Sequence, residues 1–279
     1  MPRRTLSPTL ILALLVAACA APDDYAERMS REHEGDTPIA SPGAQGSPET
    51  EITSSEVVYA DLDGTEVSGY LARPVGMQAG PGVLVIQEWW GLNDNIRSMA
   101  DQLAGAGYVA LAVDLYEGEV AEDRGGARAL VQKAMAAGER LEKNMRQARA
   151  YLVDTAGATR VGTIGWCFGG GWSLRTALVL GDGVDAAVMY YGRVVTEPER
   201  LAALSAPLLG HFGELDNGIP VDGVRQMEAA LGELGKAATV HVYEGANHAF
   251  ANPSGTRYQQ AAADLAWERT LEFFAAHLN

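Results

Sequence analysis

Cysteine is scarce in this chain. Only Cys19 and Cys167 occur among its 279 residues, which excludes a framework of several disulfides. If Cys19 is modified or removed during export, Cys167 has no intramolecular partner. A single thiol kept in an oxidising compartment suggests a use for it, whereas the alternative is a buried and inert cysteine. The neighbours of Cys167 therefore decide its role.

Basic residues are also few. The chain has 21 Lys and Arg against 36 Asp and Glu, a formal net charge of -15. Such a surface disfavours nucleic acids and anionic lipid headgroups as partners, and a strongly anionic substrate unless basic residues cluster locally. Aromatic residues make up only 7%, but the apolar total of 47% is enough for an ordinary core. The length fits one large domain or two small ones, and no internal repeat is visible.

No apolar run near the N-terminus is long enough to span a bilayer. Residues 10–18 are apolar and follow Arg3 and Arg4, a pattern typical of a secretory signal. Val16-Ala17-Ala18-Cys19 resembles a bacterial lipobox, so we predict a signal peptide over 1–18 and lipidation of Cys19. The alternatives are plain cleavage after Ala18 or Ala20, giving a secreted or periplasmic soluble protein, and a retained anchor helix. We expect a lipid-anchored protein of the bacterial cell envelope.

The next segment has a different composition. Residues 19–53 are rich in Pro, Gly, Ser, Asp and Glu and show no apolar periodicity. This composition predicts a flexible tether. His33, which lies within it, is given no role. A single domain is expected over 54–279.

Strand and helix patterns alternate through that domain. The expected strands are 56–59, 66–72, 82–87, 109–114, 161–166, 186–191, 207–212 and 239–243. The expected helices are 93–106, 124–155 with a break near Gly138, 168–180, 198–203, 221–234 and 256–277. The turn signal Asp63-Gly64 predicts an antiparallel pair at the sheet edge. The alternation predicts an α/β protein with a doubly wound, mostly parallel eight-stranded sheet and helices on both faces, which matches the α/β-hydrolase plan.

The strongest motif is the hexapeptide Gly165-Trp166-Cys167-Phe168-Gly169-Gly170 between an expected strand and an expected helix. It has the pattern of a nucleophile elbow, with Cys in the usual place of Ser. Glycines keep side chains out of the crowded strand-to-helix turn. A cysteine at a helix N-terminus is biased toward the thiolate. The N–H of Phe168 is a candidate oxyanion donor.

An acid and a base are expected after the nucleophile, in that order. His248 follows the last strand in a loop and is the favoured base. His211 and His241 lie within strands, so packing or surface roles fit them better, and His277 near the C-terminus is given none. Asp216 follows the penultimate strand and is the favoured acid, with Glu214 and Asp222 as rivals.

These segments resemble the dienelactone hydrolase family, also called carboxymethylenebutenolidases, from about Thr53 to the end. The resemblance rests on residues 87–93, 113–116, 165–170, 190–192, 213–216 and 245–250, in the expected order. It implies that Glu88 contacts the resting Cys167 and helps to activate the thiol, although a purely structural carboxylate remains an alternative. It also implies that the Trp89 N–H is a second oxyanion donor.

The chain departs from the family where the substrate carboxylate is held. The family prototype has arginines shortly after the strand-end Tyr and shortly after the catalytic His. Here the corresponding segments are 116–119 and 250–252, and neither contains a basic residue. Arg124 or Arg257 is a possible substitute, but the substrate-binding residues are unknown from the sequence. The fold and chemistry therefore carry over better than the named substrate.

We predict an ester or lactone hydrolase of the EC 3.1.1 class that uses a Cys167–His248–Asp216 triad and a thioester intermediate. The alternatives are a non-catalytic envelope lipoprotein that uses the fold as a binding module, and an enzyme of related acyl-transfer or thioester chemistry. No metal or organic cofactor is predicted, because no His, Cys and Asp cluster has ligand spacing in the sequence. The expected partner is a small ester or lactone, with no nucleic acid and membrane contact only through the anchor; the oligomeric state is not predicted.

Overall fold

The computed structural model describes residues 25–38 and 48–279. The predicted signal peptide and Cys19 lie outside these residues. The strands are β1 (Ile52–Leu62), β2 (Thr65–Pro74), β3 (Gly80–Ile86), β4 (Val109–Val113), β5 (Ala158–Trp166), β6 (Ala186–Tyr190), β7 (Leu208–Gly213) and β8 (Ala238–Tyr243). The helices are α1 (Tyr25–Glu32), α2 (Asp94–Gly105), α3 (Arg124–Ala136), α4 (Gly138–Asp154), α5 (Phe168–Leu180), α6 (Pro198–Leu201), α7 (Val221–Glu233) and α8 (Gln260–Leu278), with a 3₁₀ turn over Gly181–Gly183.

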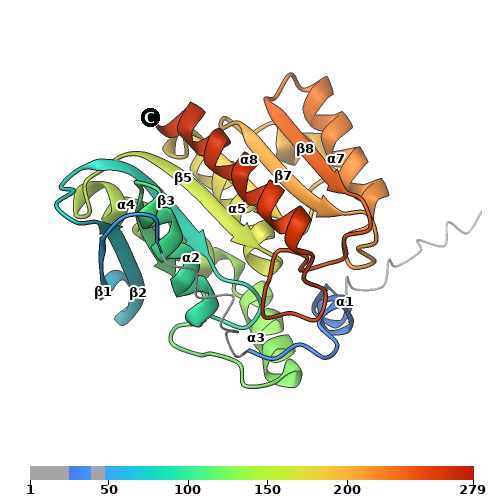
Figure 1. Cartoon of the computed structure of the whole chain (residues 1–279), viewed down its shortest axis with the longest axis horizontal. Helices are drawn as coiled ribbons and strands as arrows, with labels where there is room; N and C mark the ends of the chain where they lie inside the picture. The colour runs from blue at the N-terminus through green and yellow to red at the C-terminus, as the bar shows by residue number, and fades with distance from the viewer. Residues whose placement is uncertain (1–24, 39–47) are drawn as a thin grey trace, which may run out of the picture.

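The strands form one eight-stranded sheet in the order β1-β2-β4-β3-β5-β6-β7-β8. Strand β2 is antiparallel to both β1 and β4, and the neighbours from β4 to β8 pair in parallel. Helices α2 and α8 lie in front of the sheet and α4 and α5 behind it (Figure 1). This arrangement confirms the predicted α/β-hydrolase fold.

Burial follows from the two helical layers. Every residue of β4 and β6 is buried, as the apolar character of these strands predicts for a sheet covered on both faces. The parallel strands end at one edge of the sheet, where their loops meet, and this is the usual place of a site in such folds. Among the described residues, no helix is both long and apolar enough to cross a membrane.

Several boundaries differ from the sequence expectation, and the largest shifts are at the starts of β1 and α8. Strand β1 begins at Ile52, four residues earlier than predicted. Its first half is polar and exposed, so it lacks the apolar pattern of a buried strand, and an edge strand tolerates this. Helix α8 begins at Gln260 rather than at residue 256. The predicted break near Gly138 is present, and it separates α3 from α4.

The expectation of a structureless tether is wrong for residues 25–38. Residues 25–32 form α1, which packs against α3 (Figure 1). Tyr25, Met29 and His33 recur every four residues and therefore share one face, and all three side chains are buried. On the outer side, Arg128 of α3 donates a hydrogen bond to Glu27.

The residues after α1 are held by the domain as well. Asp36 accepts hydrogen bonds from the backbone N–H of Thr256 at 2.6 Å and from its hydroxyl at 2.8 Å. The side-chain amide of Asn93 donates to the carbonyl of Pro38 at 3.3 Å. The segment 25–38, here called the N-terminal cover, is thus anchored at both of its ends.

Candidate active site

The turn between β5 and α5 presents Cys167. Its backbone has φ 54° and ψ -115°, a strained conformation that L-residues rarely adopt. A Cβ on Gly165 would lie 2.2 Å from the carbonyl oxygen of Gly169, and one on Gly169 would lie 2.4 Å from that of Ile86. The two glycines of the motif are therefore required by the close approach of backbone to backbone, as expected for a nucleophile elbow.

His248 and Asp216 lie beside this turn, in the loops that follow β8 and β7. His248 Nδ1 lies 2.7 Å from Asp216 Oδ2, and both side chains are buried. Asp216 Oδ1 accepts a hydrogen bond from the N–H of Ile219 at 2.8 Å, which fixes the carboxylate. A ring nitrogen of His248 lies within 4.8 Å of Cys167 Sγ. The structure thus brings together the three groups predicted as a triad.

The rival acids point elsewhere. Glu214 accepts a hydrogen bond from the N–H of Gly245 at 2.9 Å in an exposed loop. Asp222 lies in the first turn of α7. His211, predicted to pack, is buried and lies within hydrogen-bond distance of the hydroxyls of Tyr243 and Thr270. Neither carboxylate competes with Asp216 for His248.

The electrostatics favour an ion pair between sulfur and imidazole. Burial raises the pKa of Cys167, but the charge of His248 and a contact with His33 outweigh it and lower the pKa to about 6. Burial lowers the pKa of His248, whereas the charges of Asp216 and Cys167 raise it well above its usual range. At neutral pH these shifts favour a thiolate beside a protonated imidazole.

Glu88 lies in the segment after β3 and is buried. Asn252 donates a hydrogen bond to Glu88 Oε2 at 2.8 Å. Burial raises the pKa of Glu88 to about 7, with the charge of Cys167 adding to the effect. Glu88 is therefore suited to hold a proton near neutral pH.

The two candidate oxyanion donors lie on segments that border Cys167. Phe168 is the first residue of α5, directly after the nucleophile. Trp89 follows Glu88 in the segment after β3, and its indole ring is fully buried. The oxyanion role of their N–H groups stays a prediction from the nucleophile-elbow pattern and the family resemblance.

His33 belongs to the site, although sequence reasoning gave it no role. Its Nε2 lies 3.5 Å from Cys167 Sγ, and its Nδ1 lies 2.9 Å from Asp36 Oδ2. Its ring stacks on Trp89 with centroids 4.5 Å apart and meets the His248 ring edge-on at 5.3 Å. The available signal was the four-residue spacing of Tyr25, Met29 and His33, which the polar composition of their surroundings obscured.

The N-terminal cover buries the sulfur. Met29 Sδ lies 3.5 Å from Cys167 Sγ, and both side chains have no exposed surface. Tyr25, one turn earlier, is also buried, and its phenol interacts with Cys167. The described conformation is therefore closed over the thiol by residues of the chain's own N-terminal segment.

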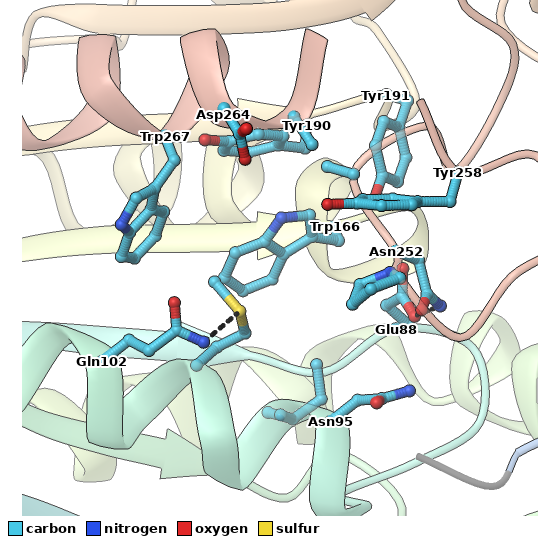
Figure 2. Close-up of a pocket in the computed structure, with 15 residues that line it drawn as sticks. Glu88, Asn95, Gln102, Trp166, Tyr190, Tyr191, Asn252, Tyr258, Asp264 and Trp267 are labelled. Carbon is cyan, nitrogen blue, oxygen red and sulfur yellow. Dashed lines mark hydrogen bonds between the residues drawn. The ribbon is translucent and has the colours of Figure 1, made fainter. Parts of the chain in front are cut away.

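Two pockets flank the covered sulfur, and Cys167 lines neither. The first contains Glu88 together with the aromatic side chains Trp166, Tyr190, Tyr258 and Trp267 (Figure 2). None of its lining residues is Lys or Arg, and it carries two carboxylates, Glu88 and Asp264. Its chemistry suits an uncharged, largely apolar group.

The second pocket lies beside Tyr25 and Phe168 and is strongly basic. Its lining includes Arg28, Arg175, Arg193 and Arg200, with Glu197 as the acidic residue. Arg175 and Arg200 pair with Glu142 and Glu197. Neither Arg124 nor Arg257, the substitutes considered from the sequence, lines it. A local cluster of basic residues, which the sequence analysis could neither place nor exclude, is therefore present. It consists of arginines other than the two considered from the sequence.

Only one group of side chains in the described part of the chain has the arrangement of metal ligands. The group consists of His33, Cys167 and His248, and all three side chains are buried. Each offers one ligand atom, and the three atoms lie within 4.8 Å of one another. Their positions are 81 or more residues apart in the sequence, so the spacing of the sequence could not reveal the cluster.

Comparison with known proteins gives a consistent result. The model of the family described as "Dienelactone hydrolase family" matches residues 67–278. A relative from Saccharolobus solfataricus, assigned as a carboxymethylenebutenolidase, is 30% identical over 254 residues, covering 77% of this chain and 96% of its own. A Bradyrhizobium protein assigned as 2-oxo-3-(5-oxofuran-2-ylidene)propanoate lactonase is 31% identical, covering 82% of this chain and 97% of its own.

A solved structure agrees. The crystal structure from Klebsiella pneumoniae assigned as a dienelactone hydrolase superposes with a TM-score of 0.74 at 27% identity, covering 82% of this chain and all of that one. These likenesses support an enzyme of ester or lactone hydrolysis and give no support to a non-catalytic envelope module.

Proposed function

Because this chain belongs to the dienelactone hydrolase family and is a carboxylic ester or lactone hydrolase, we propose that it works through Cys167, His248 and Asp216 and a thioester intermediate. The observation that carries the proposal is a buried arrangement in which His248 Nδ1 lies 2.7 Å from Asp216 Oδ2 and a ring nitrogen of His248 lies within 4.8 Å of Cys167 Sγ. The lowered pKa of Cys167 favours the thiolate nucleophile at neutral pH.

The reaction proceeds in two halves. The Cys167 thiolate attacks the carbonyl carbon and forms a C–S bond, and the N–H groups of Phe168 and Trp89 stabilise the oxyanion. As the C–O bond breaks, the protonated His248 gives its proton to the leaving alkoxide. Neutral His248 then takes a proton from water, whose oxygen attacks the thioester and releases the acid and the thiolate. Asp216 orients the ring and stabilises its charged form.

In molecules in which Cys167 is a thiol and His248 is neutral, Glu88 accepts the thiol proton. Its pKa of about 7 lets this carboxylate hold a proton near neutral pH. We expect Glu88→Gln to lower kcat/KM and to leave the fold intact, because an amide keeps the bond to Asn252 and cannot hold the proton. A kcat/KM equal to that of the wild type at all pH values would contradict the role.

Turnover requires the N-terminal cover to leave the sulfur. Met29 Sδ and His33 Nε2 lie 3.5 Å from Sγ, so they occupy the space that a substrate carbonyl needs. The cover belongs to a short N-terminal segment that forms no part of the sheet. Its displacement therefore leaves the triad and the elbow in place.

The two flanking pockets define the substrate classes to compare. The aromatic pocket favours an apolar group, and the basic pocket favours a carboxylate or another anion. The deciding experiment measures hydrolysis of p-nitrophenyl esters and of lactones with and without a carboxylate, dienelactone among them. Wild type is compared with Cys167→Ala, and Cys19→Ser is the matched thiol control.

We expect Cys167→Ala to lose hydrolysis and Cys19→Ser to retain it. Mass spectrometry of His248→Gln after mixing with ester should show an acyl group on the peptide that carries Cys167, because deacylation then lacks its base. Full activity in a folded Cys167→Ala variant refutes the mechanism.

Export and lipidation are part of the same proposal, and they rest on the N-terminal residue pattern alone. The lipobox-like sequence ending at Cys19 supports an envelope lipoprotein. Metabolic labelling with palmitate should mark the wild type and not Cys19→Ser. Labelling of neither protein, with soluble enzyme in the medium or periplasm, would favour plain secretion.

A further inference from the structure

We propose that His33, Cys167 and His248 form a binding site for a thiophilic d-block metal ion, which ties the N-terminal cover to the hydrolase domain. The three ligands come from two separate parts of the chain: His33 follows α1, whereas Cys167 and His248 belong to the sheet edge. An ion bound by all three holds the cover closed. This site lies beyond the hydrolytic reaction, although it shares Cys167 and His248 with the proposed function.

The distances suit a tetrahedral ion. Zinc binds imidazole nitrogen at about 2.0–2.1 Å and thiolate sulfur at about 2.3 Å, which in a tetrahedron separates the N and S ligands by about 3.5 Å. His33 Nε2 and Cys167 Sγ are 3.5 Å apart. All three ligand atoms lie within 4.8 Å of one another.

Both imidazoles are oriented as they are in metal sites. His33 Nδ1 lies 2.9 Å from Asp36, and His248 Nδ1 lies 2.7 Å from Asp216. Metal-bound histidines commonly give one ring nitrogen to a carboxylate and the other to the ion. A second histidine–carboxylate pair is not required by the hydrolytic mechanism. Asp36 is itself held by two hydrogen bonds from Thr256, so the pair is a supported unit.

Met29 supplies a soft fourth donor at the same place. Its Sδ lies 3.5 Å from Cys167 Sγ in a fully buried position. A set of two imidazoles, a thiolate and a thioether suits copper better than zinc, because thioethers are soft ligands. We therefore expect Cu⁺ to bind more tightly than Zn²⁺, with Met29 contributing to the difference.

The test measures metal binding directly. The full chain in a Cys19→Ser background, in which Cys167 is the only thiol, is titrated anaerobically with Cu⁺ against a chelator of known affinity. Zn²⁺ is measured by equilibrium dialysis, and Co²⁺ by its visible and thiolate charge-transfer absorption. We expect one ion per chain and a tetrahedral Co²⁺ spectrum with a sulfur ligand.

The variants separate this site from adventitious binding. His33→Gln should lower the affinity at least about 100-fold, and Asp36→Asn about 10- to 100-fold, as for the outer partner of a metal-bound histidine. Met29→Leu should weaken Cu⁺ more than Zn²⁺. His241→Gln is the matched control, because His241 lies on β8 away from the cluster, and it should bind like the parent.

Bound metal should also block alkylation of Cys167 and ester hydrolysis, and a chelator should restore both. Absence of stoichiometric binding, or unchanged affinity in folded His33→Gln, overturns the proposal. Binding and spectra are read without substrate, so a protein that binds metal but hydrolyses no ester would refute the proposed function and leave the metal site standing.

Discussion

Truncation of Met29 should expose the catalytic thiol. Met29 is the fully buried residue of α1 that contacts Cys167 Sγ, so Met29→Ala weakens the closed state specifically. Complete burial of a methionine side chain contributes about 1.5–3 kcal/mol. This transfer term is a lower bound, because a cavity left in the closed state would add to the loss. A loss of about 2 kcal/mol raises the open population about 30-fold, since 1.4 kcal/mol corresponds to a factor of ten.

The assay is the rate at which iodoacetamide alkylates Cys167 in the Cys19→Ser background. A chelator is present, so that metal does not contribute to closure. If opening and closing are fast, the rate follows the open population and rises about 30-fold. Hydrolysis of a short p-nitrophenyl ester should rise in parallel. Arg31→Ala is the control on the same helix, because the Arg31 side chain is 65% exposed.

The reasoning fails if Met29→Ala is folded and its thiol reacts at the parental rate. Burial by α1 would then not limit access to the sulfur. A faster alkylation with slower hydrolysis would instead identify Met29 as part of the productive substrate site, and it would contradict the view of α1 as a cover.

Three further outcomes follow from the site and its support. Asp216→Asn should lower kcat about 10⁴-fold in steady-state kinetics, because an amide favours the wrong tautomer of the base; a loss below tenfold would remove Asp216 from the triad. Gly170→Ala should cost about 1–3 kcal/mol or more in urea unfolding, since its Cβ would lie 2.4 Å from the carbonyl oxygen of Tyr190. Gly232→Ala, with no atom within 4 Å, should stabilise by about 0.5–1 kcal/mol, and equal effects would contradict the packing argument. Burial lowers the pKa of His211 well below its unfolded value near 6.5, so its stabilising effect is complete above about pH 6.5 and is lost as the pH falls toward the folded pKa. The slope is up to about 1.4 kcal/mol per pH unit, and thermal melts should show a shallower acid dependence for His211→Gln than for the wild type.

The elbow illustrates what the sequence could establish. Residues 165–170 predict their own turn, because no side chain other than hydrogen fits at Gly165 and Gly169. The order of Cys167, Asp216 and His248 along the chain places each group after a parallel strand, and the geometry of such a sheet brings strand ends together. These interactions are dictated by local backbone chemistry and by topology, so the pattern alone was sufficient.

The cover shows where such reasoning stops. Residues 25–38 are polar enough to be read as a tether, and an isolated helix of eight residues is not stable on its own. Its order comes from tertiary contacts with α3 and with the site, as in the pairs Glu27–Arg128 and Asp36–Thr256. The two residues of the first pair are 101 positions apart in the chain, and those of the second pair are 220 apart. Contacts over such separations produce no periodic pattern in a single sequence.

The short distance along the chain between Cys19 and α1 sets a limit on orientation. Tyr25 lies six positions after Cys19, and an extended chain reaches at most about 3.5 Å per residue, or roughly 20 Å in all. If Cys19 carries the lipid that the sequence predicts, this short connection keeps the catalytic face close to the bilayer surface. Opening would then release this face toward the headgroup layer, where amphiphilic esters concentrate.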